Sequence, residues 1–163
     1  MHVTVRVAQR VWNLRSRRCY RVVTAAFAAA RGRFGLRLIE FAVLGNHLHL
    51  VVEADHNQAL SRGMQGLSVR IAKAMNRLMG TRGAVLGDHY HAHVLETPTK
   101  VVNAIAYVLG NAARHYGIEG RDPFSSVACD RQLLLCVGMS WLLRVGWRRA
   151  RRTHREPGPI VRS

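Results

Sequence analysis

Acidic residues are scarce in this chain. Its 163 residues include nine Asp and Glu against 25 Lys and Arg, which gives a formal net charge of +16. Only Lys73 and Lys100 are lysines, and arginine makes the planar, forked contacts that suit phosphate groups. Binding to an anionic membrane surface is an alternative explanation, and a GC-rich genome would account for part of the arginine content. The charge therefore predicts a polyanionic partner and does not indicate a reaction.

Cysteines and long apolar runs are also few. The three cysteines, at positions 19, 129 and 136, form no CxxC pair, which predicts reduced thiols and a cytoplasmic protein. The N-terminus alternates and lacks the apolar core of a secretory signal. The longest mostly apolar stretch, Leu133 to Val145, contains Arg144 and is too short to span a bilayer. We therefore expect no membrane association.

What the chain does contain is enough apolar residues for one core, at 48% of the total. Alternation and helical spacing predict seven elements in the order β-α-β-β-α-β-α. Their expected spans are His2 to Val7, Arg17 to Phe34, Leu36 to Leu44, His47 to Glu53, Asp55 to Gly80, Val85 to Leu95 and Thr97 to Tyr116. We predict an α+β fold with a ferredoxin-like layout, in which helices pack on an antiparallel sheet.

Turn and cap residues support these boundaries. Gly45-Asn46 is a two-residue turn of the kind that joins antiparallel strands. Thr97 followed by Pro98 indicates a helix start, and Gly117 indicates its end. Beyond residue 120 the pattern predicts a short helix and a loose basic tail.

Two histidines in the second arm of the predicted hairpin are candidate metal ligands. His47 and His49 lie two residues apart, so a strand points both imidazoles to the same face. Such a pair supplies most of a metal site. The competing interpretation is that one imidazole packs at the edge of the core and the other caps a turn.

The last predicted helix carries a candidate nucleophile. Tyr107 and Asn111 lie four residues apart and share a helix face. A tyrosine hydroxyl can form a covalent link to phosphorus, although only about one phenol in a thousand is ionised at neutral pH. A divalent ion offsets this handicap by polarising the phosphate, and an amide oxygen is a ligand that such an ion accepts. Packing alone would also explain this pair.

The order of these motifs resembles that of a known family. The segments GNHLHLVVE, GDHYHAHV and AYVLGNAARHYG follow one another along the chain. Over about residues 1 to 120 the sequence resembles the HUH single-tyrosine transposases, in particular the REP-associated tyrosine transposases. NHLHL is similar to the HUH motif, with Leu48 as its central hydrophobic residue, and YVLGN is similar to the nucleophile helix. Many relatives have Pro after the Asn, where this chain has Ala112.

The resemblance implies a transposase domain over residues 1–120, followed by a short helix and a basic tail over 121–163. It implies that His47, His49 and Asn111 bind Mg²⁺ or Mn²⁺ and that Tyr107 attacks single-stranded DNA with hairpin or palindromic ends. The implied product is a 5′-phosphotyrosine link with a free 3′-OH, which a second 3′-OH resolves by rejoining the strands. Consistent with this, the sequence has no glycine-rich nucleotide-binding loop. Relatives act as monomers or as homodimers.

Other residues compete for these roles. His89, His91 and His93 alternate and, with Asp88 nearby, could form a second metal cluster, although contact with DNA is the preferred interpretation. The rival tyrosines are interpreted as packing or stacking groups: Tyr20, Tyr90 and Tyr116. Glu53 is predicted to face away from the histidine pair and to be structural. The rival function is a nucleic-acid-binding module without chemistry, such as a domesticated or decayed transposase.

Overall fold

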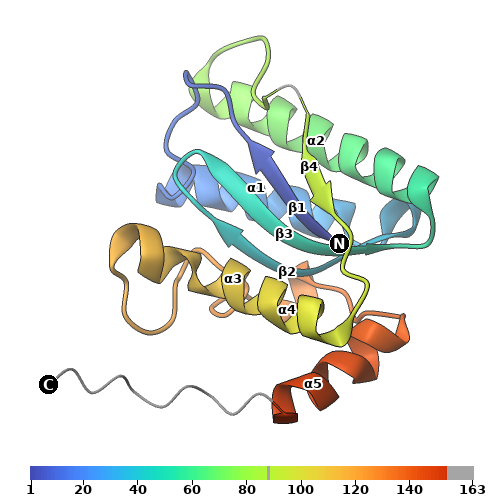
Figure 1. Cartoon of the computed structure of the whole chain (residues 1–163). Helices are drawn as coiled ribbons and strands as arrows, with labels where there is room; N and C mark the ends of the chain where they lie inside the picture. Colours follow the sequence, from blue (N-terminus) through green and yellow to red (C-terminus); the bar gives the residue numbers. More distant parts are fainter. Residues whose placement is uncertain (88, 154–163) are drawn as a thin grey trace, which may run out of the picture.

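Four antiparallel strands form one sheet in the order β2-β3-β1-β4 (Figure 1). The computed structural model describes residues 1–87 and 89–153. The strands are β1 (His2–Arg6), β2 (Leu36–Val43), β3 (His47–Ala54) and β4 (His91–His93). All three strand pairs are antiparallel. This confirms the predicted α+β fold with helices on an antiparallel sheet.

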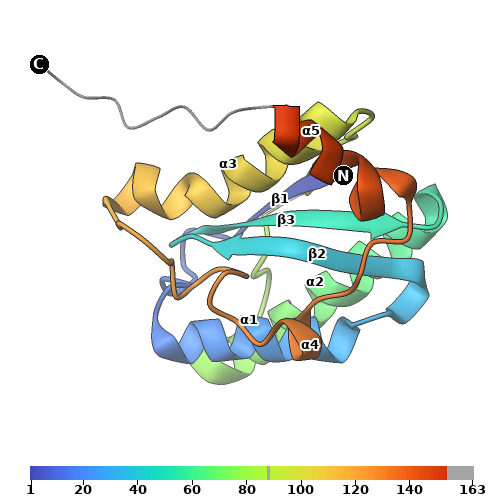
Figure 2. The same ribbon diagram turned by 90° about the horizontal axis from the view of Figure 1, so that it is seen from below.

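The helices form a layer on each face of this sheet, as Figure 2 shows. Helices α1 (Arg17–Ala30) and α2 (Asn57–Met79) cover one face, and α3 (Pro98–Tyr116) lies on the other. The main core lies between the sheet and α1 and α2. Its largest fully buried side chains include Phe27, Phe41, Leu48, Leu50 and Met64.

Strict alternation in β1 and β3 separates the two faces. Val3 and Val5 point into the main core together with Leu48 and Leu50. The residues between them, among them Thr4 and His49, therefore point to the opposite face. That face has a smaller apolar cluster, built by α3 against β2 and β3, and the rest of it is polar.

Helix α3 begins and ends where its cap residues predict. The Thr97 hydroxyl accepts a hydrogen bond from Lys100 N at 3.2 Å, and Pro98 occupies the first turn. Gly117 is left-handed, at φ 61° and ψ 25°, and its N–H donates to Ala113 O. Because both ends are fixed locally, the positions of Tyr107 and Asn111 on this helix follow from the sequence.

The fourth strand is much shorter than predicted. Of the expected span Val85 to Leu95, only His91–His93 pairs along β1. Val85 is buried in the main core, and the neighbouring Leu86 forms an isolated bridge to Val7. The first part of this segment is therefore held by the burial of Val85 and by two backbone hydrogen bonds, from Ala8 N to Val85 O and from Gly87 N to Arg6 O, each 2.8 Å long.

The chain after α3 runs along the outer edge of β2, from the α1 side of the sheet to the α3 side (Figure 2). Backbone bonds attach it there: Val43 N donates to Phe124 O at 2.9 Å, and Cys136 N donates to Leu38 O at 2.7 Å. It contains α4 (Arg131–Leu134), a wide helical turn η2 (Leu142–Gly146) and α5 (Trp147–Thr153). An edge strand that is paired in this way is protected from pairing with other chains.

This segment contains more helix than the short helix and loose basic tail that the sequence predicted. Its arginine-rich part is helical as far as residue 153, and Leu134 and Leu135 belong to the main core. Residues 154–163 lie outside the described part of the chain. The domain boundary at residue 120 stays a prediction. Within residues 1–87 and 89–153, no helix is long and apolar enough to cross a membrane.

Candidate metal and nucleophile site

The two histidines of the HLH segment meet on the α3 side of the sheet. His47 and His49 are both on β3, and their Nε2 atoms are 3.1 Å apart. His49 is buried at 5% exposure. Two nitrogen ligands about 2.1 Å from one octahedral ion and at a right angle would be about 3.0 Å apart. The spacing therefore suits two ligands of one ion.

Neighbouring groups fix the orientation of each ring. Asn46 Oδ1 accepts a hydrogen bond from His47 Nδ1 at 2.7 Å, which leaves a lone pair on His47 Nε2. His49 Nδ1 lies 3.1 Å from both Thr4 Oγ1 and His2 Nε2. In the absence of an ion, His49 Nε2–H donates to His47 Nε2. To bind a cation through Nε2, neutral His49 would carry its proton on Nδ1 instead, where Thr4 Oγ1 or His2 Nε2 can accept it, and the Nδ1 partners of both rings would keep them oriented.

Both imidazoles are held in their neutral form. Burial, with smaller contributions from the nearby His47, His2, His115 and Arg6, lowers the pKa of His49 to about 4. Burial, Arg6 and His115 also lower the pKa of His47. A histidine must be neutral to bind a metal ion. The pair is therefore in its ligand form at neutral pH.

Tyr107 faces this pair from α3. Its ring centroid lies 5.3 Å from that of His49 and 5.6 Å from that of His2, edge-on in both cases. The side chain is 37% exposed, and the Arg114 guanidinium lies 5.4 Å from the ring centroid. The phenol is therefore both close to the imidazoles and open to solvent, with a positive charge beside it.

Asn111 is buried one helical turn further on, at 1% exposure. Its Nδ2 donates to Tyr107 O at 2.8 Å. Among the described residues, Asn111 Oδ1 is the one buried side-chain oxygen or nitrogen without a hydrogen-bond partner. Leaving such an atom unpaired costs about 1–3 kcal/mol. An unpaired buried acceptor of this kind is typical of a site that binds a cation or a water molecule.

The predicted donor set consists of two imidazole nitrogens and one amide oxygen. Within residues 1–87 and 89–153, no group of three or more His, Cys, Asp or Glu side chains could hold a metal ion. An ion at this site would therefore depend on the amide and would take its other ligands from water or from a phosphate. These chemical types fit a hard or intermediate divalent ion.

Sequence reasoning missed the contribution of β1. His2 and Thr4 contact His49, and Arg6 lies opposite His47 in the strand register. The signal was present, because polar residues alternate with Val3, Val5 and Val7, but only the valines were interpreted. Proximity across strands cannot be read from one strand alone.

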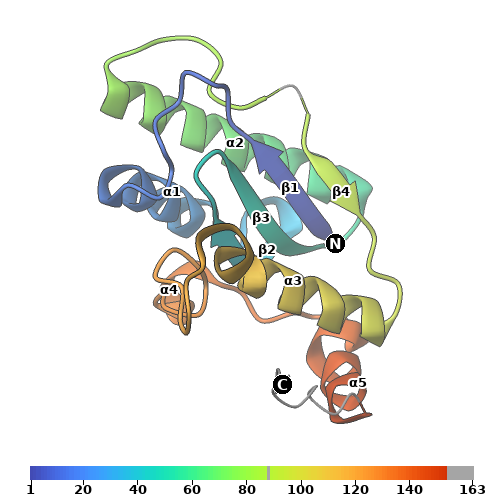
Figure 3. The ribbon, with the colours of Figure 1, turned by 60° about the vertical axis from the view of Figure 1, so that its left-hand side comes forward.

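The HxHxH segment belongs to the same face. His93 pairs with His2 and His91 with Thr4, so both side chains point to the side of His49. Figure 3 shows that α3 lies beside β2 and β3 and leaves β1 and β4 uncovered. His89 is exposed and lies outside β4, and Asp88 lies outside the described residues. The separate cluster of three histidines is therefore not formed within the described chain.

The prediction for the direction of Glu53 was wrong. Positions 47, 49, 51 and 53 of β3 share one face, because the irregularity in this pairing lies on β2 between Leu38 and Glu40. Its structural role is clear from its contacts. Glu53 accepts hydrogen bonds from Arg37 Nε at 2.7 Å, Met139 N at 2.6 Å and Ser140 N at 2.8 Å.

The rival tyrosines make packing contacts. Burial raises the pKa of Tyr20 to about 12, and its ring packs against Phe124. The Tyr116 hydroxyl accepts a hydrogen bond from Gly45 N at 2.8 Å, and Arg15 lies over its ring. Tyr90 packs partly buried against the main core. Tyr107 is the tyrosine whose ring lies against His49.

Comparison with known proteins supports this architecture. No protein-family model and no curated protein match the chain. A solved structure of a REP-associated tyrosine transposase bound to a REP hairpin is similar, with a TM-score of 0.62 and 16% sequence identity. The similarity covers 77% of this chain and 74% of that one. The chain therefore has the fold of a REP-associated tyrosine transposase.

Proposed function

We propose that this protein is a tyrosine transposase of the HUH type, which cleaves and rejoins single-stranded DNA. In this proposal Tyr107 is the nucleophile, and His47, His49 and Asn111 hold a divalent cation. The observation that carries it is the Tyr107 ring 5.3 Å from that of His49, one turn from a buried Asn111 oxygen without a partner. The fold, shared with a transposase that binds a DNA hairpin, supports the same function.

The ion would be Mn²⁺ or Mg²⁺, and when bound it would neutralise the phosphate and favour its attack. Imidazole ligands suit a first-row ion such as Mn²⁺ better than Mg²⁺, which prefers oxygen. The work of β1 is to orient the ligands: Thr4 and His2 contact Nδ1 of His49 and keep its Nε2 directed at His47.

The chemical step exchanges one phosphodiester for another. The Tyr107 oxygen loses its proton and forms a bond to phosphorus, while the bond from phosphorus to the 3′-oxygen of the neighbouring nucleotide breaks. That 3′-oxygen takes up a proton, and the DNA 5′-phosphate stays on the tyrosine. Attack by a second 3′-OH reverses the step. Because the phosphotyrosine retains the energy of the broken bond, joining needs no nucleotide cofactor.

The exposed polar face provides the surface for the DNA. The side chains of Arg6, His91 and His93 on β1 and β4 are exposed, and Arg114 lies beside the phenol. These groups surround the pair of ligands with positive or protonatable charge, which favours a phosphate backbone. Because one chain supplies the phenol, both imidazoles and the amide, a monomer could carry out the reaction.

The test is covalent attachment of the protein to DNA. Wild-type protein, incubated with a labelled hairpin oligonucleotide and Mn²⁺, should give an adduct that survives denaturing electrophoresis. Tyr107→Phe should give none, and the matched control Tyr116→Phe should retain the adduct. Adduct formation by Tyr107→Phe would refute the assignment. If wild-type protein binds the oligonucleotide but forms no adduct with Mn²⁺ or Mg²⁺, the protein is a binding module.

A further inference from the structure

A groove of about 660 Å³ lies on the other side of α3 from Tyr107. Its walls come from α3, the segment around α4 and helix α5. Ile105 and Leu109 of α3 line it, and they are offset by two positions from Tyr107 and Asn111, so they lie on roughly the opposite side of the helix. The groove is therefore separate from the proposed catalytic site.

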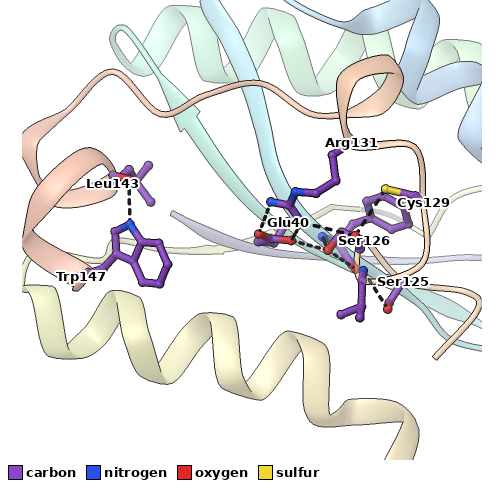
Figure 4. Close-up of polar contacts among 9 residues, drawn as sticks. Glu40, Ser125, Ser126, Cys129, Arg131, Leu143 and Trp147 are labelled. Carbon is purple, nitrogen blue, oxygen red and sulfur yellow. Dashed lines mark hydrogen bonds and ion pairs between the residues drawn. The ribbon is translucent and has the colours of Figure 1, made fainter. Parts of the chain in front are cut away.

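Positive charge dominates the lining of this groove. Among the described residues it has four arginines, at 31, 131, 148 and 151, and one carboxylate, that of Glu40. Arg131 already neutralises that carboxylate through bonds of 2.6 and 3.1 Å, and Glu40 also accepts from Ser126 (Figure 4). Arg148 and Arg151 are exposed, and no described carboxylate pairs with either. The groove thus offers arginines to an anionic ligand.

The floor of the groove is apolar and aromatic. Ile105, Leu109 and Leu143 line it together with Trp147. The Trp147 indole donates to Leu143 O at 3.0 Å, which fixes the ring, and Figure 4 shows it across the groove from Arg131. The Arg148 guanidinium lies 5.8 Å from the Trp147 ring. A second hollow of about 600 Å³ shares Leu143 and Arg148 with the groove and adds Trp141, which is 54% exposed.

We propose that this groove binds unpaired nucleotides of a single-stranded nucleic acid. The bases would rest on the apolar floor and on Trp147, and the phosphates would contact Arg148 and Arg151. Aromatic platforms combined with basic side chains are how proteins bind single strands without reading sequence. The volume lies within the range of about 300–1,000 Å³ that holds compact organic ligands, so one or two nucleotides fit.

The composition of the groove favours this ligand over others. A duplex presents its phosphates and keeps its base faces stacked, so it would leave the apolar floor exposed. A second copy of this chain would have to place acidic side chains against the arginines, and each copy has only nine acidic residues. Several of these already form ion pairs within the chain. A flexible single strand supplies both negative charge and flat apolar surfaces.

This inference extends the proposed function but is tested without it. Fluorescence anisotropy would measure binding of a labelled oligo-dT to the full chain in EDTA, where no divalent ion is present and no adduct forms. The double variant Arg148→Ala/Arg151→Ala should bind about tenfold more weakly. The magnitude of its slope of log affinity against log salt should fall by about 1.4, because two phosphate contacts are lost.

The matched control is Arg62→Ala/Arg77→Ala, which removes two exposed arginines from α2 on the other side of the sheet. Its affinity and salt slope should stay close to those of wild type. Equal weakening of both double variants would overturn the proposal, since it would indicate a general effect of charge. Loss of self-association in the groove variant, measured by sedimentation with DNA binding unchanged, would overturn it in favour of a contact between copies.

A final arm separates this inference from the proposed function. With saturating hairpin oligonucleotide and Mn²⁺, the groove variant should still form the covalent adduct, because Arg148 and Arg151 do not line the catalytic site. If no variant forms an adduct but the groove variant alone loses affinity and salt slope, the groove proposal stands and the enzymatic one fails.

Discussion

The two faces of the sheet use the same strands for different purposes. On the α1 and α2 side, Val3, Val5, Leu48 and Leu50 are almost completely buried in one large core. On the α3 side, the residues between them are His2, Thr4, Arg6, His47 and His49, and much of that surface is open. One face therefore stabilises the fold, and the other carries side chains that can bind a metal ion or a phosphate. Removing side chains from each face should affect different measurements.

The largest expected effect comes from removing the imidazole pair. His47→Ala/His49→Ala should lower the rate of strand cleavage about a thousandfold or more, because both side-chain nitrogens of the proposed ion site are lost. The free energy of unfolding in EDTA should fall by about 1–3 kcal/mol at most, because the hydrogen bonds of the rings and the space they fill are lost. Single-turnover cleavage and chemical denaturation would measure the two quantities. If the double variant lost much stability but still cleaved DNA, the imidazoles would be structural and the assignment of chemistry to this face would be wrong.

The matching change on the other face is Phe41→Ala. Phe41 is fully buried, and its ring lies 4.9 Å from that of Phe27. The substitution should reduce the free energy of unfolding by about 3–5 kcal/mol, through lost burial and the cavity left behind. Affinity for Mn²⁺ should be unchanged in the folded fraction. Urea denaturation with and without the ion would show whether the faces are independent.

The sequence predicted more of the helical and strand framework than of the site. The caps of α3 and the alternation in β3 are local, so Tyr107, Asn111, His47 and His49 could be placed on their elements. The contact of His2 with His49 depends on the pairing of β1 with β3, which no local pattern reveals. The attachment of residues 121–153 to β2 uses backbone groups, which leave no residue signature. The wrong prediction for Glu53 has a different cause: it lies an even number of residues from His47 and His49, so the sequence alone places it on their face of the strand.

Glu53 lies on the same face of the sheet as His47 and His49, but its role is to stabilise the fold. Burial alone would raise the pKa of Glu53. The hydrogen bonds that its carboxylate accepts from Ser140, Met139 and Arg37 outweigh this effect and lower the pKa to about 2. A lowered carboxylate pKa stabilises the fold fully above the unfolded value of about 4.5, by roughly 3 kcal/mol. That contribution is lost as the pH falls from about 4.5 to 2.

Glu53→Gln should therefore unfold more easily at neutral pH, by about 1–3 kcal/mol, and lose less stability than wild type on acidification. Thermal denaturation between pH 7 and pH 2.5 would measure both. Parallel pH curves for the two proteins would show that the carboxylate does not make this contribution.

The smallest effect should come from the groups that orient His49. Thr4→Val removes the hydroxyl 3.1 Å from His49 Nδ1 without changing side-chain size. Affinity for Mn²⁺ should fall by about tenfold to a hundredfold, with the fold intact. Thr4→Ser, which keeps the hydroxyl, should restore most of it. Titration calorimetry would give both affinities, and equal values for Val and Ser would remove the proposed role of the hydroxyl.

The central claim is that the phenol of Tyr107, and no other, attacks DNA beside the His47–His49 pair. The most direct measurement is mass spectrometry of the protein–DNA adduct after digestion of both components. The account predicts a nucleotide attached through its 5′-phosphate to Tyr107. Attachment to Tyr20, Tyr90 or Tyr116, or through a 3′-phosphate, would contradict it.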